Sequence, residues 1–561
     1  MKKISLFFSF VVVVSILLAA CQPAATPVVE PTAVIQKVEF TAAPVQPTSA
    51  PVVEATAVPE PTKPPEKEVD TEAKVVVGME TIIENLDWMT NSTLNSFSIW
   101  EQLYDRLVDL DDKVVLQPMV GKEWSISEDG KVWTFKLRDD VKFWDGTPLT
   151  AKDVVYTFDR MQIPDYNIGN TTYMNSQFNY EKSVAVDDYT LEIYTKDPVP
   201  ALLYTLEGIN ILPEHVYSKL TPEEAGSVTI MGSGSFVFKE FKKDDLVTLE
   251  RNDNYWGKKS QIKTLIYRQI AEPGTRIAEL ETGGVDVIQS VPMDQFDSVD
   301  ALPNAHVTAI SNGCRQYLGF NLYNNPTYQD KRVRQALNYA VDWEVINQAI
   351  FKGAAPRLPI HVNKPWQNEN LKAYEFDPAK VESLLTEAGY AKDADGVWAK
   401  DGKKLAPSIM IYYPKGSERD LVLLSLTDQF KKQGIPAEPF YLERSAAFEK
   451  LDKREIDDMF FIGSCTSYEG QGDISDLQAD SGSNYGRWNN PEFEALYKDL
   501  LKEFDLAKRK ELLDKMQVIV NEEAPMISLW IRIDVWGISD KLDWKPNPTG
   551  LAVLTGAVKY K

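Results

Sequence analysis

Short apolar runs with alternating polar positions recur along the chain after residue 73. A period of two between apolar positions is typical of half-exposed β-strands. Segments with helical periodicity lie between and after these runs, so the pattern predicts a mixed α/β protein. Strands are predicted at residues 74–78, 132–137, 190–195, 235–241, 247–252, 264–270, 285–291, 306–310 and 317–322.

Three segments of the second half of the chain have the pattern of amphipathic helices. In the first, Asp377 is a good N-cap, Pro378 occupies the first helical position and Gly389 follows the last turn. A second helix is expected to begin after Asp330, which is also an N-cap residue type. A third, long helical stretch is predicted from Pro491 to about Asn521.

The stretch "VKFWDGTPLTAKDVVYTFDR" at residues 141–160 combines several local signals. We predict that Phe143-Trp144 ends a strand and that Asp145-Gly146 forms a turn. Thr150 and Asp153 have the spacing of a capping box at the start of a helix. Every residue of the stretch therefore has a structural reason, and none is needed for chemistry.

The N-terminal 20 residues have the features of a secretory leader, with Lys2 and Lys3 followed by an apolar run. The run is shorter than the roughly 20 apolar residues that a membrane span needs. It ends in "LAAC", which resembles the lipobox of bacterial lipoproteins. That resemblance implies cleavage before Cys21 and lipid attachment to its thiol, whereas a plain signal peptide is the alternative.

Residues 21–72 are rich in Pro, Ala, Thr, Val and Glu and poor in large apolar side chains. Such a composition cannot bury enough apolar surface to offset the entropy lost on ordering. Pro-rich linkers are extended and semi-rigid, so we expect a spacer between a membrane surface and the folded body. The lipid on Cys21 would be the only membrane anchor.

The remaining body of about 490 residues is too long for one hydrophobic core and predicts two or more lobes. The formal net charge of −23 disfavours nucleic acid and anionic lipid headgroups as partners. After Cys21, only Cys314 and Cys465 remain. They either pair as a disulfide or stay as two separate buried thiols.

The body is poor in residues typical of catalysis. It has three histidines, His215, His306 and His361, and none lies at metal-ligand spacing from a second His or a Cys. There is no G-x-S-x-G motif. The "GSGSFVF" stretch at residues 232–238 lacks the G-K-[ST] ending of a phosphate loop and predicts a tight turn entering a strand. We therefore expect no enzyme, no metal site and no cofactor.

Five ordered stretches resemble the motifs of the family 5 extracellular solute-binding proteins, which serve ABC importers. The first is the 141–160 stretch, which is similar to the family's "F-x-DGTP-x-TA-x-DV" signature. The others are "GSGSFVFKEFKKDDLVTLERNDNYWG" (232–257), "FNLYNNPTYQDKRVRQALNYAVDWEVI" (320–346), "YEFDPAKVESLLTEAGY" (374–390) and "WNNPEFEALYKDL" (488–500). The resemblance covers about residues 75–538.

The resemblance implies a two-lobed periplasmic-binding-protein fold of the large three-subdomain type, with a hinge between the lobes. Lobe I would comprise residues 73–317, with an inserted subdomain at about 96–204. Lobe II would comprise 318–525, and the chain would return to lobe I at 526–561. The ligand would be enclosed between the lobes.

Peptide binders of this family hold the ligand's amino terminus with an Asp in a "W-x-[AG]-D-Y" segment of lobe II. The corresponding stretch here is "GSCTSYEGQGDISDL" at 463–477, and Ser467 takes the place of that Asp. Glu469 and Asp473 lie close by in sequence and are candidates to supply the missing charge, because a buried ammonium needs a paired anion. In lobe I, the neutral residues at 91–93 replace an acidic position that is common in oligopeptide binders.

The resemblance thus implies a set of ligand-binding residues, which includes hydroxyl, amide, aromatic and acidic side chains. Such neutral polar groups suit an oligosaccharide as well as a peptide. The candidates are Asn91, Ser92, Thr93, Cys465, Ser467, Tyr468, Glu469, Asp473 and Trp488.

The resemblance implies an extracytoplasmic substrate-binding lipoprotein that captures peptides and delivers them to the permease subunits of an ABC importer. An oligosaccharide ligand is the alternative within the family. From other classes, a surface receptor without transport and a secreted hydrolase remain open. We expect a monomer that reaches the membrane only through its lipid.

Overall fold

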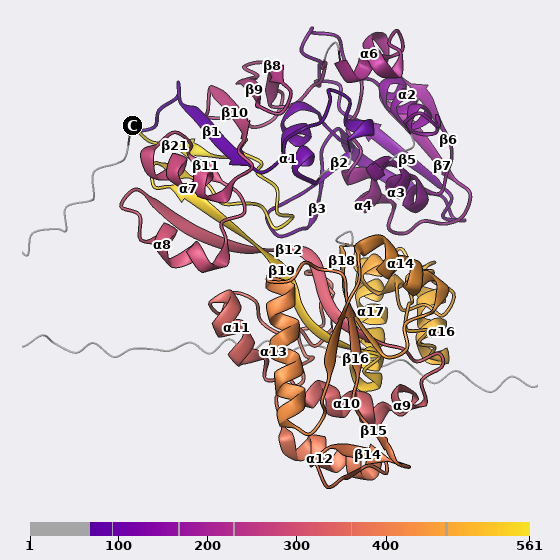
Figure 1. Cartoon of the computed structure of the whole chain (residues 1–561). Coiled ribbons are helices and arrows are strands. Elements are labelled where there is room, and N and C mark those ends of the chain that lie inside the picture. Colours follow the sequence, from indigo (N-terminus) through magenta and orange to yellow (C-terminus); the bar gives the residue numbers. More distant parts are fainter. Residues whose placement is uncertain (1–67, 92–93, 167–168, 228–229, 361, 466–468) are drawn as a thin grey trace, which may run out of the picture. The chain divides into compact units, whose positions relative to one another are not determined.

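The computed structural model describes residues 68–561 except 92–93, 167–168, 228–229, 361 and 466–468 (Figure 1). The predicted leader, the lipidation site Cys21 and most of the predicted linker lie outside the described residues. The part from Glu66 to Lys561 forms one compact unit. It is a mixed α/β structure, which confirms the predicted fold class.

A ten-stranded mixed sheet runs through this unit. Its spatial order begins in the C-terminal half of the chain, passes through two long strands and ends in the N-terminal half. In that order the strands are β17 (Glu438–Tyr441), β16 (Ser408–Ile411), β18 (Met459–Cys465), β12 (Ala305–Phe320), β19 (Met526–Ser539), β11 (Val287–Ile288), β1 (Lys74–Met79), β10 (Thr264–Gln269), β9 (Leu246–Arg251) and β8 (Phe236–Lys242).

The sheet contains two parallel triplets, β10-β1-β11 and β17-β16-β18. The long strands β12 and β19 are antiparallel to each other and lie between the triplets (Figure 1). Their pairing is continuous at both ends but shifts in register between Ser311 and Arg315. The chain therefore crosses between the two triplets on two adjacent strands.

Four clusters of buried apolar side chains pack against this sheet. Two of them, built mainly from residues 75–309 and 533–557, form what we call the first lobe. The other two, built mainly from residues 317–530, form the second lobe. The division at 317/318 that was predicted from sequence falls inside β12, and the predicted return at 526 is the first residue of β19. These boundaries remain a proposal.

The first lobe also carries a four-stranded sheet, β4-β5-β7-β6, and helices of both lobes surround the sheets. The first-lobe strands are β2 (Val108–Leu110), β3 (Leu116–Pro118), β4 (Gly121–Ile126), β5 (Val132–Leu137), β6 (Tyr180–Asp187), β7 (Thr190–Thr195), β20 (Leu542–Asp543) and β21 (Val558–Lys559). The first-lobe helices are α1 (Leu94–Leu103), α2 (Ala151–Met161), α3 (Gly169–Phe178), α4 (Leu202–Glu207), α5 (Glu214–Tyr217), α6 (Pro222–Ser227), α7 (Pro273–Thr282) and α8 (Phe296–Asp300).

The second lobe has a small three-stranded sheet, β13 (Ala391–Lys392), β14 (Trp398–Lys400) and β15 (Lys403–Lys404). Its helices are α9 (Pro326–Gln329), α10 (Lys331–Tyr339), α11 (Trp343–Phe351), α12 (Pro378–Glu387), α13 (Glu418–Lys432), α14 (Arg444–Lys453), α15 (Gln471–Ser475), α16 (Pro491–Leu500) and α17 (Leu506–Glu523). None of the helices within the described ranges is long and apolar enough to cross a lipid bilayer.

The predicted capping signals are confirmed where the structure tests them. The Asp377 side chain accepts the backbone N–H groups of Ala379 and Lys380, and α12 begins at Pro378. At α2, the backbone N–H of Thr150 donates to Asp153 Oδ2 over 2.8 Å, which completes the predicted capping box. These helices therefore begin where local chemistry places them.

Several predicted boundaries are wrong. The strands predicted at 306–310 and 317–322 are one strand, β12, and the one predicted at 285–291 is only two residues long. Phe143-Trp144 does not end a strand, since this region has only an isolated bridge between Lys142 and Pro148. The helix predicted at 491–521 is interrupted, because Asp505 caps a new helix, α17. The ends of these strands and helices are set by strand pairing and by capping residues within the segment. The periodicity of apolar residues reveals neither of them.

Candidate functional site

The carboxyl ends of the two parallel triplets point at the same stretch of the two long strands. β18 ends at Cys465, which pairs with Cys314 near the middle of β12. β11 ends at Ile288, which pairs with Gly537 of β19 and so runs toward the middle of β19 from the other side. In open α/β sheets, ligands bind outside the carboxyl ends of parallel strands. The middle of β12 and β19 is therefore the candidate site, which we call the strand crossing.

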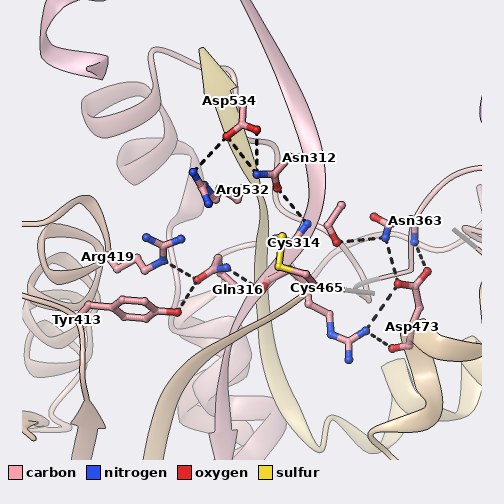
Figure 2. Close-up of a disulfide and its surroundings, with 12 residues drawn as sticks. Asn312, Cys314, Gln316, Asn363, Tyr413, Arg419, Cys465, Asp473, Arg532 and Asp534 are labelled. Atoms are coloured by element: carbon pink, nitrogen blue, oxygen red, sulfur yellow. Dashed lines mark hydrogen bonds and ion pairs between the residues drawn. A yellow bond between two sulfur atoms is a disulfide. The ribbon is translucent and has the colours of Figure 1, made fainter. Parts of the chain in front are cut away.

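A disulfide between Cys314 and Cys465 closes this stretch (Figure 2). It ties β12 to the last residue of β18 across a sequence separation of 151 residues. Cys314 is buried and Cys465 is exposed. The choice that the sequence left open is thus resolved as a disulfide, and Cys465 has no free thiol to offer a ligand.

Gln316 of β12 positions the guanidinium of Arg419 beside the disulfide (Figure 2). Its Nε2 donates to the carbonyl oxygen of Arg315 over 2.9 Å, which fixes the amide orientation. Its Oε1 then accepts the Nε–H of Arg419 over 2.9 Å, and the guanidinium lies 4.5 Å above the ring of Tyr413. Arg419 has no acidic partner within ion-pair distance among the described residues. The terminal guanidinium nitrogens are therefore held in place for a ligand oxygen.

Asp534 and Arg532 of β19 lie beside Asn312 in the same stretch, and Glu418 lies next to Arg419 on α13. Asp534 of β19 accepts two hydrogen bonds from the Asn312 amide over 3.1 Å and pairs with Arg532 over 3.4 Å. Burial raises the pKa of Asp534, and it also raises the pKa of Glu418, although Arg419 and Arg532 oppose the shift in Glu418. The crossing thus combines acids and cations in a partly dehydrated place, where such groups interact more strongly than in water.

Aromatic rings continue this surface beyond the carboxyl end of β16. The rings of Tyr412 and Tyr413 lie 4.2 Å apart, and Phe448 of α14 lies 5.3 Å from Tyr412. The exposed Arg444 lies over both Tyr412 and Phe448 at 5.6 Å and 5.4 Å. Aromatic faces next to polar groups suit ligands with flat or apolar parts.

The structure gives Glu469 a local structural role. Its carboxylate accepts the backbone N–H groups of Gln471, over 2.6 Å, and of Gly472, so it caps α15. It is 4 % exposed, and burial lowers the pKa of the nearby Arg509 while the charge of Glu469 opposes that shift.

Asp473 is buried in a paired network and is not available as a free anion. Its two oxygens accept the backbone and side-chain N–H groups of Asn363 over 2.8 Å and 3.1 Å. Arg315 lies 3.7 Å from the same carboxylate and also pairs with Asp476. The structure thus gives Asp473 a structural role with a matched charge, and its candidate role as an ammonium ligand stays a prediction.

Two further candidates are structural. Asn91 is 1 % exposed, accepts the backbone N–H of Glu84 over 2.8 Å and donates to the Asp87 carbonyl over 2.7 Å. Trp488 is buried in the second-lobe core, with its ring 5.0 Å from Phe493. The candidates Ser92, Thr93, Ser467 and Tyr468 lie outside the described residues.

Contacts between the lobes among the described residues include an ion pair of 2.9 Å between Lys352, which follows α11, and Asp297 of α8, and two aromatic contacts. The ring of Tyr204, from α4 of the first lobe, lies 6.4 Å from that of Trp366 in the second lobe. Phe504, from the loop before α17, lies 6.0 Å from Trp133 of β5 and packs on Gly130. A methyl group on Gly130 would come within 2.8 Å of the Phe504 ring, so this contact needs glycine there.

The sequence analysis missed Gln316, Tyr413 and Arg419. A signal was present in "SIMIYYPKGSER" at 408–419, where a short apolar run ends in a Pro-Lys-Gly turn and a capping Ser417. Identifying the apolar run as a parallel strand would have placed Tyr413 and Arg419 at its carboxyl end. Among the residues that the structure covers, no group of three or more His, Cys, Asp or Glu side chains is arranged to hold a metal ion.

Comparison with known proteins agrees with this architecture. Residues 115–486 match the profile of the bacterial extracellular solute-binding proteins, family 5, middle region. The chain is 28 % identical over 455 residues to heme-binding protein A of Haemophilus influenzae, covering 76 % of this chain and 81 % of that protein. It is 27 % identical over 454 residues to the oligopeptide-binding protein AppA of Bacillus subtilis, covering 78 % and 82 %. The solved structure of HbpA2 from Haemophilus parasuis superposes with a TM-score of 0.77 at 26 % identity, covering 87 % of this chain and all of that one.

Proposed function

Because the chain belongs to the bacterial extracellular solute-binding proteins of family 5, we propose that it captures peptides at the strand crossing and delivers them to the permease of an ABC importer. The observation that carries this proposal is the convergence of both parallel triplets on one stretch of β12 and β19. A ligand bound there contacts both lobes, and it favours the closed arrangement only as far as it binds that arrangement more tightly.

The contacts available at the crossing support a peptide ligand. Arg419, oriented by Gln316 and Tyr413, suits a ligand carboxylate. Glu469 is the carboxylate nearest in sequence to the place of the family's amine-binding Asp, and we assign it to the ligand's amino group. The paired rings of Tyr412 and Tyr413 suit the apolar parts of peptide side chains.

An oligosaccharide is the second candidate ligand. Ser467, which occupies the place of the family's Asp, favours it. A sugar ring stacks on Tyr412 or Phe448 without needing a charge partner. The two candidates differ in one respect, since only the peptide depends on both Arg419 and Glu469.

We further propose that the protein is lipid-anchored through Cys21, acts as a monomer outside the cytoplasm and performs no catalysis. The "LAAC" sequence supports the anchor, and the Pro-rich composition of residues 21–67 supports a spacer between the lipid and the lobes. The predicted linker boundary at 72 lies too far along the chain, because Val69 and Asp70 already pair with Tyr560 and Lys559 of the folded unit. Mass spectrometry of the N-terminal peptide from membranes tests the anchor. A peptide beginning at Cys21 with added acyl mass supports it, and an unmodified thiol contradicts it.

Calorimetry on protein stripped of ligand tests the proposed binding. A mixture of short peptides should bind, and Arg419→Gln and Glu469→Gln should each weaken binding at least tenfold, which corresponds to about 1.4 kcal/mol. Lys239→Gln, an exposed position on β8, removes one charge elsewhere and should leave affinity unchanged. Binding of neutral oligosaccharides but not of peptides would reject the peptide and support the second candidate.

A further inference from the structure

Arg106 in the first lobe is surrounded by more carboxylates than it can neutralise. Its guanidinium lies 2.6 Å from Asp109 of β2, 3.1 Å from Glu101 of α1 and 3.7 Å from Glu207 of α4. Asp105 also interacts with Arg106, while it accepts hydrogen bonds from Tyr255 and Trp256. Arg106 itself is 3 % exposed. Carboxylates that share one buried cation compete for it, and the carboxylate that it stabilises least takes up a proton most easily.

The proton falls most readily on Glu207 and Glu101. Burial raises the pKa of Glu207 to about 8, with Arg106 opposing the shift and Glu101 and Asp109 adding to it. Burial also raises the pKa of Glu101. Glu207 is at the C-terminal end of α4 and its side chain is 21 % exposed. It can therefore gain or lose its proton to the solvent near neutral pH.

The six-residue helix α4 connects this cluster to the second lobe. Leu202 and Leu206 are buried in the first-lobe core. Tyr204 points the other way, packs on the second-lobe core and accepts a hydrogen bond from Trp366. Glu207 faces Arg106. One short helix thus joins a proton-holding cluster to a contact between the lobes.

We propose that α4 is a pH-sensitive latch, in which ionisation of the acid cluster around Arg106 shifts α4 and releases Tyr204 from Trp366. When Glu207 loses its proton, its charge adds to those of Asp109 and Glu101 without a further cation to balance it. The ionised Glu207 carboxylate is then better solvated when it turns toward water, and this movement displaces the C-terminal end of α4. The contact between Tyr204 and Trp366 is closed in neutral or mildly acidic medium and released in alkaline medium, while the other contacts between the lobes remain.

The latch regulates the ligand site assigned above, so its biological consequence rests on the proposed function. A ligand enclosed between the lobes should be held less tightly as pH rises through about 8. The latch itself is tested on ligand-free protein. Failure of peptide binding and failure of the latch are therefore separate results.

Hydrogen–deuterium exchange on the ligand-free full chain, corrected for the intrinsic pH dependence of exchange, measures the latch directly. Between pH 6.5 and pH 9.0, we expect protection to fall at least fivefold both in the segment 202–209 and in the segment around Trp366. Glu207→Gln keeps the neutral form at every pH and should reduce both changes to less than twofold. Glu223→Gln, an exposed carboxamide control on α6, should behave like the parent protein.

Thermal melting at pH 6.5 verifies that Glu207→Gln is folded, and Tyr204→Phe provides a second variant. Tyr204→Phe keeps the ring but lacks the hydroxyl that meets Trp366, so its Trp366 segment should be less protected already at pH 6.5. The proposal is overturned if protection in both segments is independent of pH in the parent protein. It is also overturned if the 202–209 segment opens while the Trp366 segment does not, or if Glu207→Gln retains the full pH response.

Discussion

Two buried arginines, Arg106 in the first lobe and Arg315 in the second, show what charge balance does inside this protein. Arg315 is 2 % exposed and meets two carboxylates, Asp473 and Asp476, one of which is also held by Asn363. Arg106 is equally buried but meets a larger excess of acids. The Arg315 network holds α15 against β12, whereas in the Arg106 cluster burial raises the pKa of Glu207 to about 8.

The comparison explains why Asp473 was a poor candidate for ligand binding. A fully paired buried carboxylate fixes structure, and its removal leaves another charge unmatched. An acid in excess has a shifted pKa and is available for regulation. We therefore distinguish the two networks by the number of carboxylates around each arginine: the Arg315 network is structural, and the Arg106 cluster responds to pH.

The largest effect should come from Arg315→Met. It leaves Asp473 and Asp476 without their cation in a buried place, which costs about 3–5 kcal/mol of unfolding free energy. Urea unfolding at pH 7 measures it. Lys453→Met, an exposed position on α14, is a control that should change stability by less than about 0.5 kcal/mol. An Arg315→Met protein as stable as the parent would show that the network is not a structural one.

Replacing both cysteines, as Cys314→Ser with Cys465→Ser, should have the next largest effect. The bond closes a loop of about 150 residues, and removing such a cross-link costs roughly 2–5 kcal/mol. The same comparison in reducing buffer should bring the parent protein close to the double variant. Equal melting temperatures of the two proteins in oxidising buffer would contradict this account of the second lobe.

Arg106→Met should be milder than Arg315→Met and should depend on pH. The acids around Arg106 can take up protons, so the cost should be about 1–3 kcal/mol at pH 6. The sign follows from the raised pKa of Glu207: its stabilising contribution is present at low pH and is lost as pH rises toward about 8. In Arg106→Met, the free energy of unfolding should therefore fall more steeply with pH than in the parent protein, which urea unfolding at several pH values measures. If the cost of Arg106→Met is the same at every pH from 5 to 9, Arg106 and Arg315 do not differ in the way proposed.

The smallest effect should be that of Asn490→Ala at the start of α16. The Asn490 side chain accepts the backbone N–H groups of Glu492 and Phe493, so its loss costs about 1 kcal/mol. Asn490→Asp retains the acceptor and should stay within about 0.5 kcal/mol of the parent. This cap lies outside both arginine clusters. Its loss therefore gives the stability change of one local hydrogen-bonding interaction, with which the two arginine variants can be compared.

Much of the fold was predictable from sequence because it depends on local signals. The strand at 132–137 follows from apolar alternation and the strand at 74–79 from a short apolar run, and the starts of α2 and α12 follow from Thr150 and Asp377. The two crossing strands were not predictable as such. β12 is a single strand because β18 and β19 pair along its length. This pairing joins residues far apart in sequence, so the local pattern of apolar residues does not predict it.

The candidate site was harder to predict than the fold. Position in a family motif selected Asp473 and Trp488, yet both are committed to the second-lobe interior. Gln316 and Arg419 are separated by about 100 residues, and only the pairing of β12, β18 and β16 brings them together. Residue type alone could not indicate which charges find a partner inside the protein and which stay free for a ligand.

Native mass spectrometry of gently purified protein tests most directly the claim that a ligand is held at the strand crossing by Arg419. The parent protein should carry a discrete non-covalent mass that is released on mild activation. Arg419→Gln, purified in parallel with Lys239→Gln as the control, should lose at least nine-tenths of that occupancy. Equal ligand occupancy in Arg419→Gln and in the parent would contradict the account.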